Sequence, residues 1–190
     1  MPRVAPFVGT LALLAVGGCA SSGSAPSAAP PVTVTPVTQR IVSSSGTLNI
    51  NTVHVNAGSS QLVDASVDAA WTALNLAYGE LGIPITTLVD AQHLIGNDAY
   101  KVRRRIGKIT MQNIFDCGNA MGIPNAETYD ILMSISSTIV PNPKGGVNLN
   151  TRIDATGKSP NFSRDASVAC SSLGALENAI ADLVRKKTGV

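Results

Sequence analysis

The hydrophobic and polar positions of the chain divide it into an apolar leader, a segment of small residues and a long patterned region. In the patterned region, apolar residues recur either at spacings of three and four, which favours an amphipathic helix, or at every second position, which favours a strand with one buried face. The patterned region begins near residue 40 and runs to the end of the chain. It therefore predicts a folded unit, whereas the two segments before it do not.

Two helices and a shorter third one are predicted in this region. Residues 66–81 have a 3–4 apolar spacing, with Ser66 as the N-cap and Gly82 after the last turn. Residues 173–184 carry a second apolar stripe that is followed by basic residues, which suits the negative end of the helix dipole. A short helix is expected over residues 110–117, with its apolar residues turned inward.

Strands are predicted before and between these helices. Residues 48–55 are rich in strand-forming residues, and their alternation changes phase near Thr52, which predicts a bulge. Residues 85–95 and 100–106 predict two strands of a hairpin that turns through residues 96–98.

The clearest alternation lies later, over residues 129–140 and 147–156, with a turn-rich loop at 141–146. One apolar and one polar face predict an antiparallel sheet that is covered on one side. The order of elements predicts an α+β fold: an antiparallel sheet of about five strands, with a helix after the first strand and a C-terminal helix packed on one face. Residues 40–190 are expected to form this single domain.

The leader carries the most specific motif of the chain. Residues 7–16 are an apolar run that follows Arg3 and is too short to span a bilayer. The run ends in residues 16–19, Val-Gly-Gly-Cys. This resembles the lipobox of bacterial lipoproteins, although valine stands where leucine is commoner. The alternatives are a short transmembrane anchor and an ordinary secretory peptide in which the cysteine is accidental.

The lipobox resemblance implies a membrane anchor on Cys19. It implies a signal peptide over residues 1–18, a diacylglyceryl thioether on Cys19 and a fatty acyl group such as palmitate on the new amine. Ala20 follows the cysteine, and the sorting pattern of enteric bacteria then implies the outer membrane, facing the periplasm. Residues 19–39 contain almost only small residues, serine, threonine and proline, and are expected to be a disordered tether. The alternative is a strand at residues 32–34.

Composition excludes several classes of protein. Charged residues make up 14% of the 190 residues and the formal net charge is +2, so a nucleic-acid partner is not expected. The hydrophobic content of 44% is too high for a disordered chain. Apart from Cys19, the chain has Cys117 and Cys170, an even pair in a compartment that permits disulfides. We predict that they are bonded; the alternative is two buried or reactive thiols.

The only concentrated charge of the folded region lies around Arg104. On a strand, Lys101, Arg103 and Arg105 would share one face. One interpretation is a solvated face that protects a sheet edge from aggregation. The other is a contact for an anion, such as a lipid headgroup, lipopolysaccharide or an acidic protein.

Motifs for catalysis and for metal binding are absent from the sequence. His54 and His93 lie far apart and no HxH, HExxH or Cys-His cluster occurs, so no metal site is expected. The sequence has no GxSxG motif, and Gly157-Lys158-Ser159 lacks the earlier glycine of a phosphate-binding loop. We therefore expect neither an enzyme nor a cofactor.

Two functions are consistent with these observations. The element order resembles the helix-grip or TATA-binding-protein-like domains found in the C lipoprotein of the outer-membrane barrel-assembly machine. This resemblance, which rests on element order, implies a lipid-anchored interaction or scaffold module with an envelope protein as partner. The alternative is a carrier that binds a lipid or a small hydrophobic ligand between the helix and the sheet.

Overall fold

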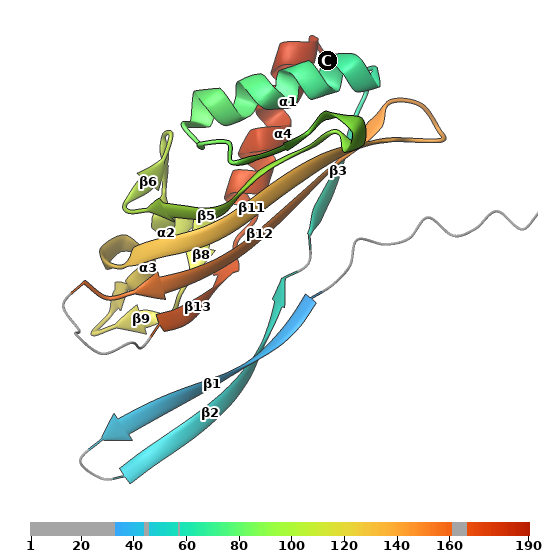
Figure 1. The fold of residues 1–190 in the computed structure, drawn as a ribbon. Coiled ribbons are helices and arrows are strands. Elements are labelled where there is room, and N and C mark those ends of the chain that lie inside the picture. Colours follow the sequence, from blue (N-terminus) through green and yellow to red (C-terminus); the bar gives the residue numbers. More distant parts are fainter. Residues whose placement is uncertain (1–32, 44–45, 57, 161–166) are drawn as a thin grey trace, which may run out of the picture.

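The computed structural model describes residues 33–43, 46–56, 58–160 and 167–190 (Figure 1). Most of these residues belong to antiparallel strands. In chain order the elements are β1 (Thr33–Ser43), β2 (Gly46–Asn56), β3 (Ser59–Val63), α1 (Val67–Leu81), β4 (Thr87–Val89), the 3-10 turn η1 (Asp90–Gln92), β5 (Leu94–Val102), β6 (Arg105–Ile106), β7 (Ile109–Thr110), α2 (Met111–Ile114), β8 (Phe115–Asp116), β9 (Asn119–Ala120), β10 (Ile123–Pro124), α3 (Asn125–Thr128), β11 (Asp130–Pro141), β12 (Val147–Lys158), β13 (Ser167–Ser172) and α4 (Ala175–Thr188).

The main sheet has seven strands in the order β4-β5-β11-β12-β13-β8, and β3 also pairs with β12. Every pairing in the sheet is antiparallel. Strand β12 uses one edge twice: residues 147–151 pair with β3 and residues 155–158 pair with β13. Strands β3 and β13, which are far apart in sequence, therefore lie along the same edge of β12.

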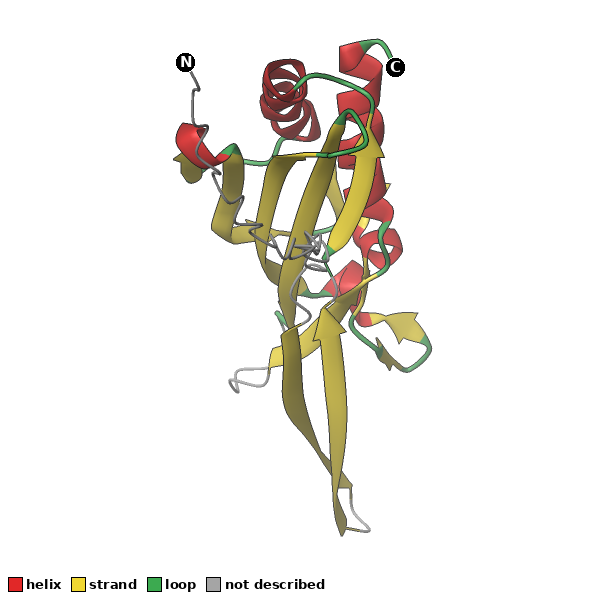
Figure 2. Cartoon of the chain, turned by 90° about the vertical axis from the view of Figure 1, so that its right-hand side faces the viewer, coloured by secondary structure: helices red, strands yellow, loops and turns green. Residues whose placement is uncertain are grey.

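One face of this sheet is buried under helices. In β11 and β12 the odd-numbered residues are buried, except Pro141 at the end of β11, and the even-numbered ones are half-buried or exposed. Helices α1 and α4 pack against each other on the buried face, and Figure 2 shows them together on one side of the sheet. The predicted α+β class, including the C-terminal helix, is confirmed, although the sheet has more strands than expected.

The ends of α1 are formed by the predicted residues. The Ser66 side chain accepts a hydrogen bond from the Ala69 backbone N–H at 3.3 Å. Gly82 ends the helix in the left-handed conformation, with φ 69°. A residue without a Cβ adopts this conformation at little cost, so the chain can leave the helix sharply.

The predicted hairpin turn at residues 96–98 is wrong. Strand β5 runs through these residues, and the turn between β4 and β5 lies at η1 and His93. Gly96 is needed for a different reason, because a Cβ there would lie 2.5 Å from the backbone oxygen of Ile135. The glycine allows β5 to approach β11 closely, and a register shift follows between Met133 and Ile135.

Strands β1 and β2 form a separate two-stranded sheet that extends from the body (Figure 1). Their register is continuous from Thr33↔Asn56 to Ser43↔Gly46, so the bulge predicted near Thr52 is absent. Residues 33–39, which were expected to belong to the tether, lie in β1 and are paired with β2. Alternating threonine and valine allow this pairing once β2 supplies a partner strand. Cys19 and the rest of the predicted signal peptide and tether lie outside the described residues.

Candidate functional site

A disulfide joins Cys117 and Cys170, as the sequence predicts, with an S–S distance of 2.04 Å. The pairing of β8 with β13 places Asp116 opposite Ser171, so the next residues along each strand, Cys117 and Cys170, lie opposite each other. The bond therefore continues the antiparallel ladder by one covalent rung. Both cysteines are buried.

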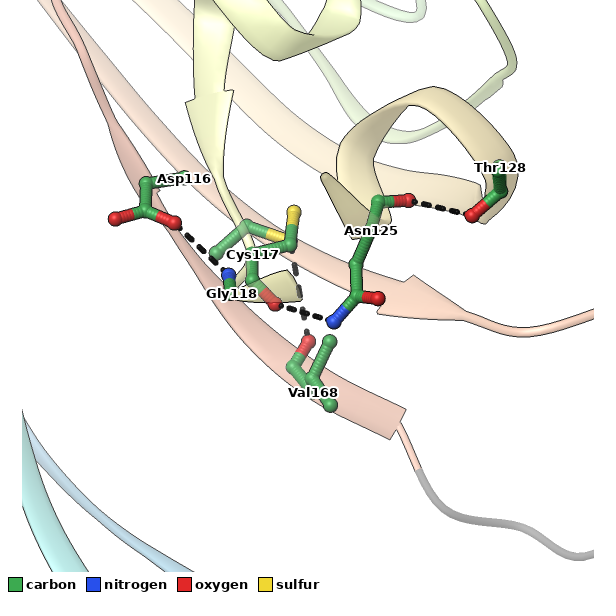
Figure 3. The surroundings of a disulfide bond; sticks show 7 residues. Asp116, Cys117, Gly118, Asn125, Thr128 and Val168 are labelled. Carbon is green, nitrogen blue, oxygen red and sulfur yellow. Dashed lines mark hydrogen bonds between the residues drawn. A yellow bond between two sulfur atoms is a disulfide. The ribbon is translucent and has the colours of Figure 1, made fainter. Parts of the chain in front are cut away.

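The disulfide forms the base of a short hairpin made of β9 and β10. The Asn125 backbone N–H donates to the Gly118 oxygen at 2.9 Å, and the Asn125 Nδ2 donates to the Cys117 oxygen at 3.0 Å. On the other side, the Gly118 N–H donates to the Asp116 Oδ1 at 2.9 Å. Figure 3 shows these groups around the disulfide. The two ends of the hairpin are thus fixed to each other and, through Cys170, to the main sheet.

The tip of this hairpin is apolar and fully exposed. Met121 and Gly122 form the turn, with φ of 53° and 81°. A two-residue turn in which both φ values are positive favours asparagine or glycine at its first position, so methionine is unusual there. The Met121 side chain is completely exposed and Ile123 is 51% exposed. Residues 117–126 contain no charge.

A polar cleft of about 410 Å³ lies on the other side of α3. Its lining residues are Arg103, Arg104, Glu127, Thr128, Ser159 and Pro160. Asn125 at the start of α3 belongs to the hairpin base, whereas Thr128 at its end lines the cleft. Arg103 Nη2 donates to the Thr128 oxygen at 3.3 Å, and Arg103 Nε lies 3.7 Å from Asp130 Oδ1. The hairpin and the cleft therefore share one end of the molecule.

The three basic residues predicted to share a strand face do not do so. Strand β5 ends at Val102, and Arg104 adopts a positive φ of 73°, which turns the chain into β6. Lys101 stays on β5 opposite Leu132, Arg103 lines the cleft, and Arg105 lies on β6.

The edge-protecting interpretation stays a prediction for Lys101. Strand β4 pairs only with residues 94–96 of β5, so, among the residues that the structure describes, the end of β5 at Lys101 is paired with β11 alone. Only Arg103, of the three residues predicted as an anionic contact, lies in the cleft, and it is joined there by Arg104 and Glu127. The cleft thus has mixed charge.

A chain of three hydroxyl groups lies in the core. Tyr78 on α1 donates to Ser137 Oγ at 3.0 Å, and Ser137 Oγ lies 2.9 Å from Thr151 Oγ1. Ser137 and Thr151 are direct partners across β11 and β12. All three side chains are buried, and burial raises the pKa of the Tyr78 hydroxyl well above its usual range. The sequence signal was available: Ser137 and Thr151 interrupt the apolar alternation at core positions of both strands.

Two further side chains have contacts that stabilise the fold. His93 contacts Trp71 edge-to-face, with 5.6 Å between ring centroids. Glu177 lies in the first turn of α4, and its Oε1 accepts a hydrogen bond from Ser172 Oγ at 2.6 Å.

Among the residues that the structure describes, no three His, Cys, Asp or Glu side chains gather where they could hold a metal ion. Within the same residues, none of the helices is long and apolar enough to cross a bilayer.

Comparisons with protein-family models, with curated proteins and with solved structures find no match to this chain.

Proposed function

We propose that this protein is a lipid-anchored envelope lipoprotein whose folded domain is a non-catalytic interaction module. The anchor rests on the lipobox at Cys19. The interaction role rests on one structural observation: Met121 is fully exposed at the tip of a hairpin whose base is joined by the Cys117–Cys170 disulfide.

This arrangement favours contact with another molecule. An apolar side chain in a left-handed turn position costs roughly 1–3 kcal/mol of backbone strain, and it gains nothing from burial within the domain. The bond to Cys170 and the Asn125 hydrogen bonds hold Met121 and Ile123 at a fixed place despite this cost. A rigid base reduces the entropy lost when an exposed group binds.

The core favours this function over catalysis or transport. Tyr78, Ser137 and Thr151 could supply hydroxyl chemistry, but they are buried where a substrate would not reach them. A carrier that holds its ligand between α1 and the sheet would need space there, and the Tyr78 side chain occupies that position and is bonded to Ser137 on β11. Native mass spectrometry provides the matching test, because a carrier purified from the envelope would keep a small bound mass until it is denatured.

The proposal is tested by crosslinking in the native envelope. A photoreactive residue is placed at position 121 of the full-length chain, and a matched control carries it at Leu76, an apolar residue of α1 that is 56% exposed. We expect a covalent adduct from position 121 and none from position 76. The anchor is tested separately by the mass of the N-terminal peptide. The variant Cys19→Ser should carry no lipid and should keep the size of the unprocessed chain. Equal labelling at both positions would remove the interaction role, and an unmodified Cys19 would remove the anchor.

A further inference from the structure

The β9–β10 hairpin has apolar side chains at its tip that do not pack against the rest of the protein. Its tip, Met121 to Ile123, makes no part of the core, while the residues just before it, Phe115 and Cys117, are fully buried. The chain thus changes from buried to exposed within a few residues, and the exposed part points away from the sheet beside β13 (Figure 2). This is the shape of a short finger on a rigid base.

The size of the finger distinguishes between kinds of partner. A stable protein–protein interface buries about 800 Å² on each side. Two apolar side chains at a hairpin tip cannot supply that area. Contact with the boundary between headgroups and acyl chains has no such minimum area, because its strength scales with the apolar surface that is buried. The finger therefore fits a lipid surface better than a protein surface.

The charge of the hairpin supports the same partner. No residue from 117 to 126 carries a charge, so no ionised group would have to leave water when the tip enters lipid. The backbone polar groups at the base are already bonded, through Gly118 and Asn125. Only residues 121–123 have to reach the lipid.

The chain before the described residues limits how far the domain can lie from the membrane. Residues 20–32 separate the predicted lipid on Cys19 from the start of β1 and can span at most roughly 45 Å. Strand β2, the partner of β1, contacts β13, which pairs with β8 immediately before the hairpin. If these residues form the predicted tether, the effective concentration of the finger at the membrane is about millimolar, so weak insertion is enough to orient the domain.

We propose that the β9–β10 finger inserts Met121 and Ile123 into the lipid surface to which the protein is anchored, and so fixes the orientation of the domain on the membrane. This inference rests on the proposed function and names the molecule that the interaction surface contacts. It assigns Met121 as a lipid-contact residue, which the disulfide holds in place.

The experiment uses the full-length lipidated protein in vesicles of phosphatidylethanolamine and phosphatidylglycerol that also contain brominated phosphatidylcholine. Bromine quenches indole fluorescence at contact, and an inserted side chain lies about 5–10 Å into the headgroup–acyl boundary. Met121→Trp and Ile123→Trp place an indole on the finger, and Leu76→Trp places one on α1 as the control. All variants keep Trp71, so wild-type protein gives the background.

The expected result is bromine quenching beyond the wild-type background for Met121→Trp and Ile123→Trp, with none for Leu76→Trp. Lipidated, vesicle-bound protein whose added indoles are quenched no more than the control would overturn the inference while the anchor stands. A protein adduct as the sole product of the crosslinker at position 121 would also overturn it and leave the interaction module in place. The absence of a lipid on Cys19 would contradict the proposed function itself. The mass of the N-terminal peptide tests that anchor, whereas quenching tests the finger.

Discussion

Replacing Ser137 with alanine removes the middle member of the buried hydroxyl chain. Ser137 receives the Tyr78 hydrogen bond at 3.0 Å and lies 2.9 Å from the Thr151 hydroxyl. Without it, two buried hydroxyl groups lose their partner at once. Each unsatisfied buried polar group costs about 1–3 kcal/mol, so Ser137→Ala should lower the free energy of unfolding by about 2–6 kcal/mol.

Substitutions at the two ends of the hydroxyl chain should have smaller effects. Tyr78→Phe leaves Ser137 bonded to Thr151 and should cost only about 1 kcal/mol, the value of one ordinary hydrogen bond. The combined variant Tyr78→Phe/Ser137→Ala/Thr151→Val removes every hydroxyl and leaves none unsatisfied. It should therefore recover most of the loss and lie within about 1 kcal/mol of wild type, because replacing all partners with apolar groups is close to neutral.

Urea unfolding with matched slopes provides the measurement. A shift in the midpoint at constant slope reports stability alone. The reasoning is refuted if Ser137→Ala costs no more than Tyr78→Phe, or if the triple variant is less stable than Ser137→Ala. Either result would mean that water or backbone groups satisfy the hydroxyls.

The buried hydroxyl chain also predicts that the stability of the fold depends on pH in the alkaline range. Burial raises the pKa of Tyr78 above its ordinary value of 10.0, so above that pH the unfolded state loses a proton that the folded state keeps. The stability contributed by the neutral hydroxyl is therefore complete below pH 10.0 and falls as the pH rises further. Tyr78→Phe lacks this group, and its stability relative to wild type should rise over that range. Subtracting the two curves removes the contribution of Tyr100, whose pKa burial also raises.

Three further outcomes follow from the geometry. The double substitution Cys117→Ser/Cys170→Ser should lower the free energy of unfolding by about 4 kcal/mol, because the disulfide closes a long loop. In thermal melts of the wild-type protein, reductant should lower the melting temperature for the same reason. Mild peroxide should add one oxygen atom to Met121 and leave the buried Met111 and Met133 unmodified, which peptide mass spectrometry would show. Oxidation of Met111 or Met133 at a similar rate would contradict their burial. Gly96→Ala should destabilise the sheet by over about 1 kcal/mol in urea unfolding, because its Cβ would meet the Ile135 oxygen at 2.5 Å, and an unchanged midpoint would show that β5 can move away.

The parts of the fold that follow from local patterns could be predicted. The helix from Ser66 to Gly82 has a cap at each end, and β11 and β12 alternate over twelve residues each. The disulfide followed from counting cysteines. In each case the signal lies within one segment or in a residue type with few alternatives.

The rest depended on partners that are distant in sequence. Gly96 indicated a turn, although the glycine serves the close approach of β11. Residues 33–39 read as a tether because the strand that pairs with them follows later in the chain. The finger was missed because β9 and β10 have two residues each, too few for a periodic pattern. Its only sequence signal was the uncharged Met121-Gly122 pair between a cysteine and an asparagine.

The double use of the β12 edge has a consequence for the order in which the chain folds. The β11–β12 hairpin closes through near neighbours, but β3 is made long before β12, and β13 comes after it. Strand β3 must therefore remain without this partner while residues 64–146 are synthesised. The covalent rung at Cys170 closes after β13 has been added. Such long-range pairing slows folding, and during that interval an open strand edge is exposed to other chains. We expect a chain that stops before residue 167 to be retained by chaperones or degraded.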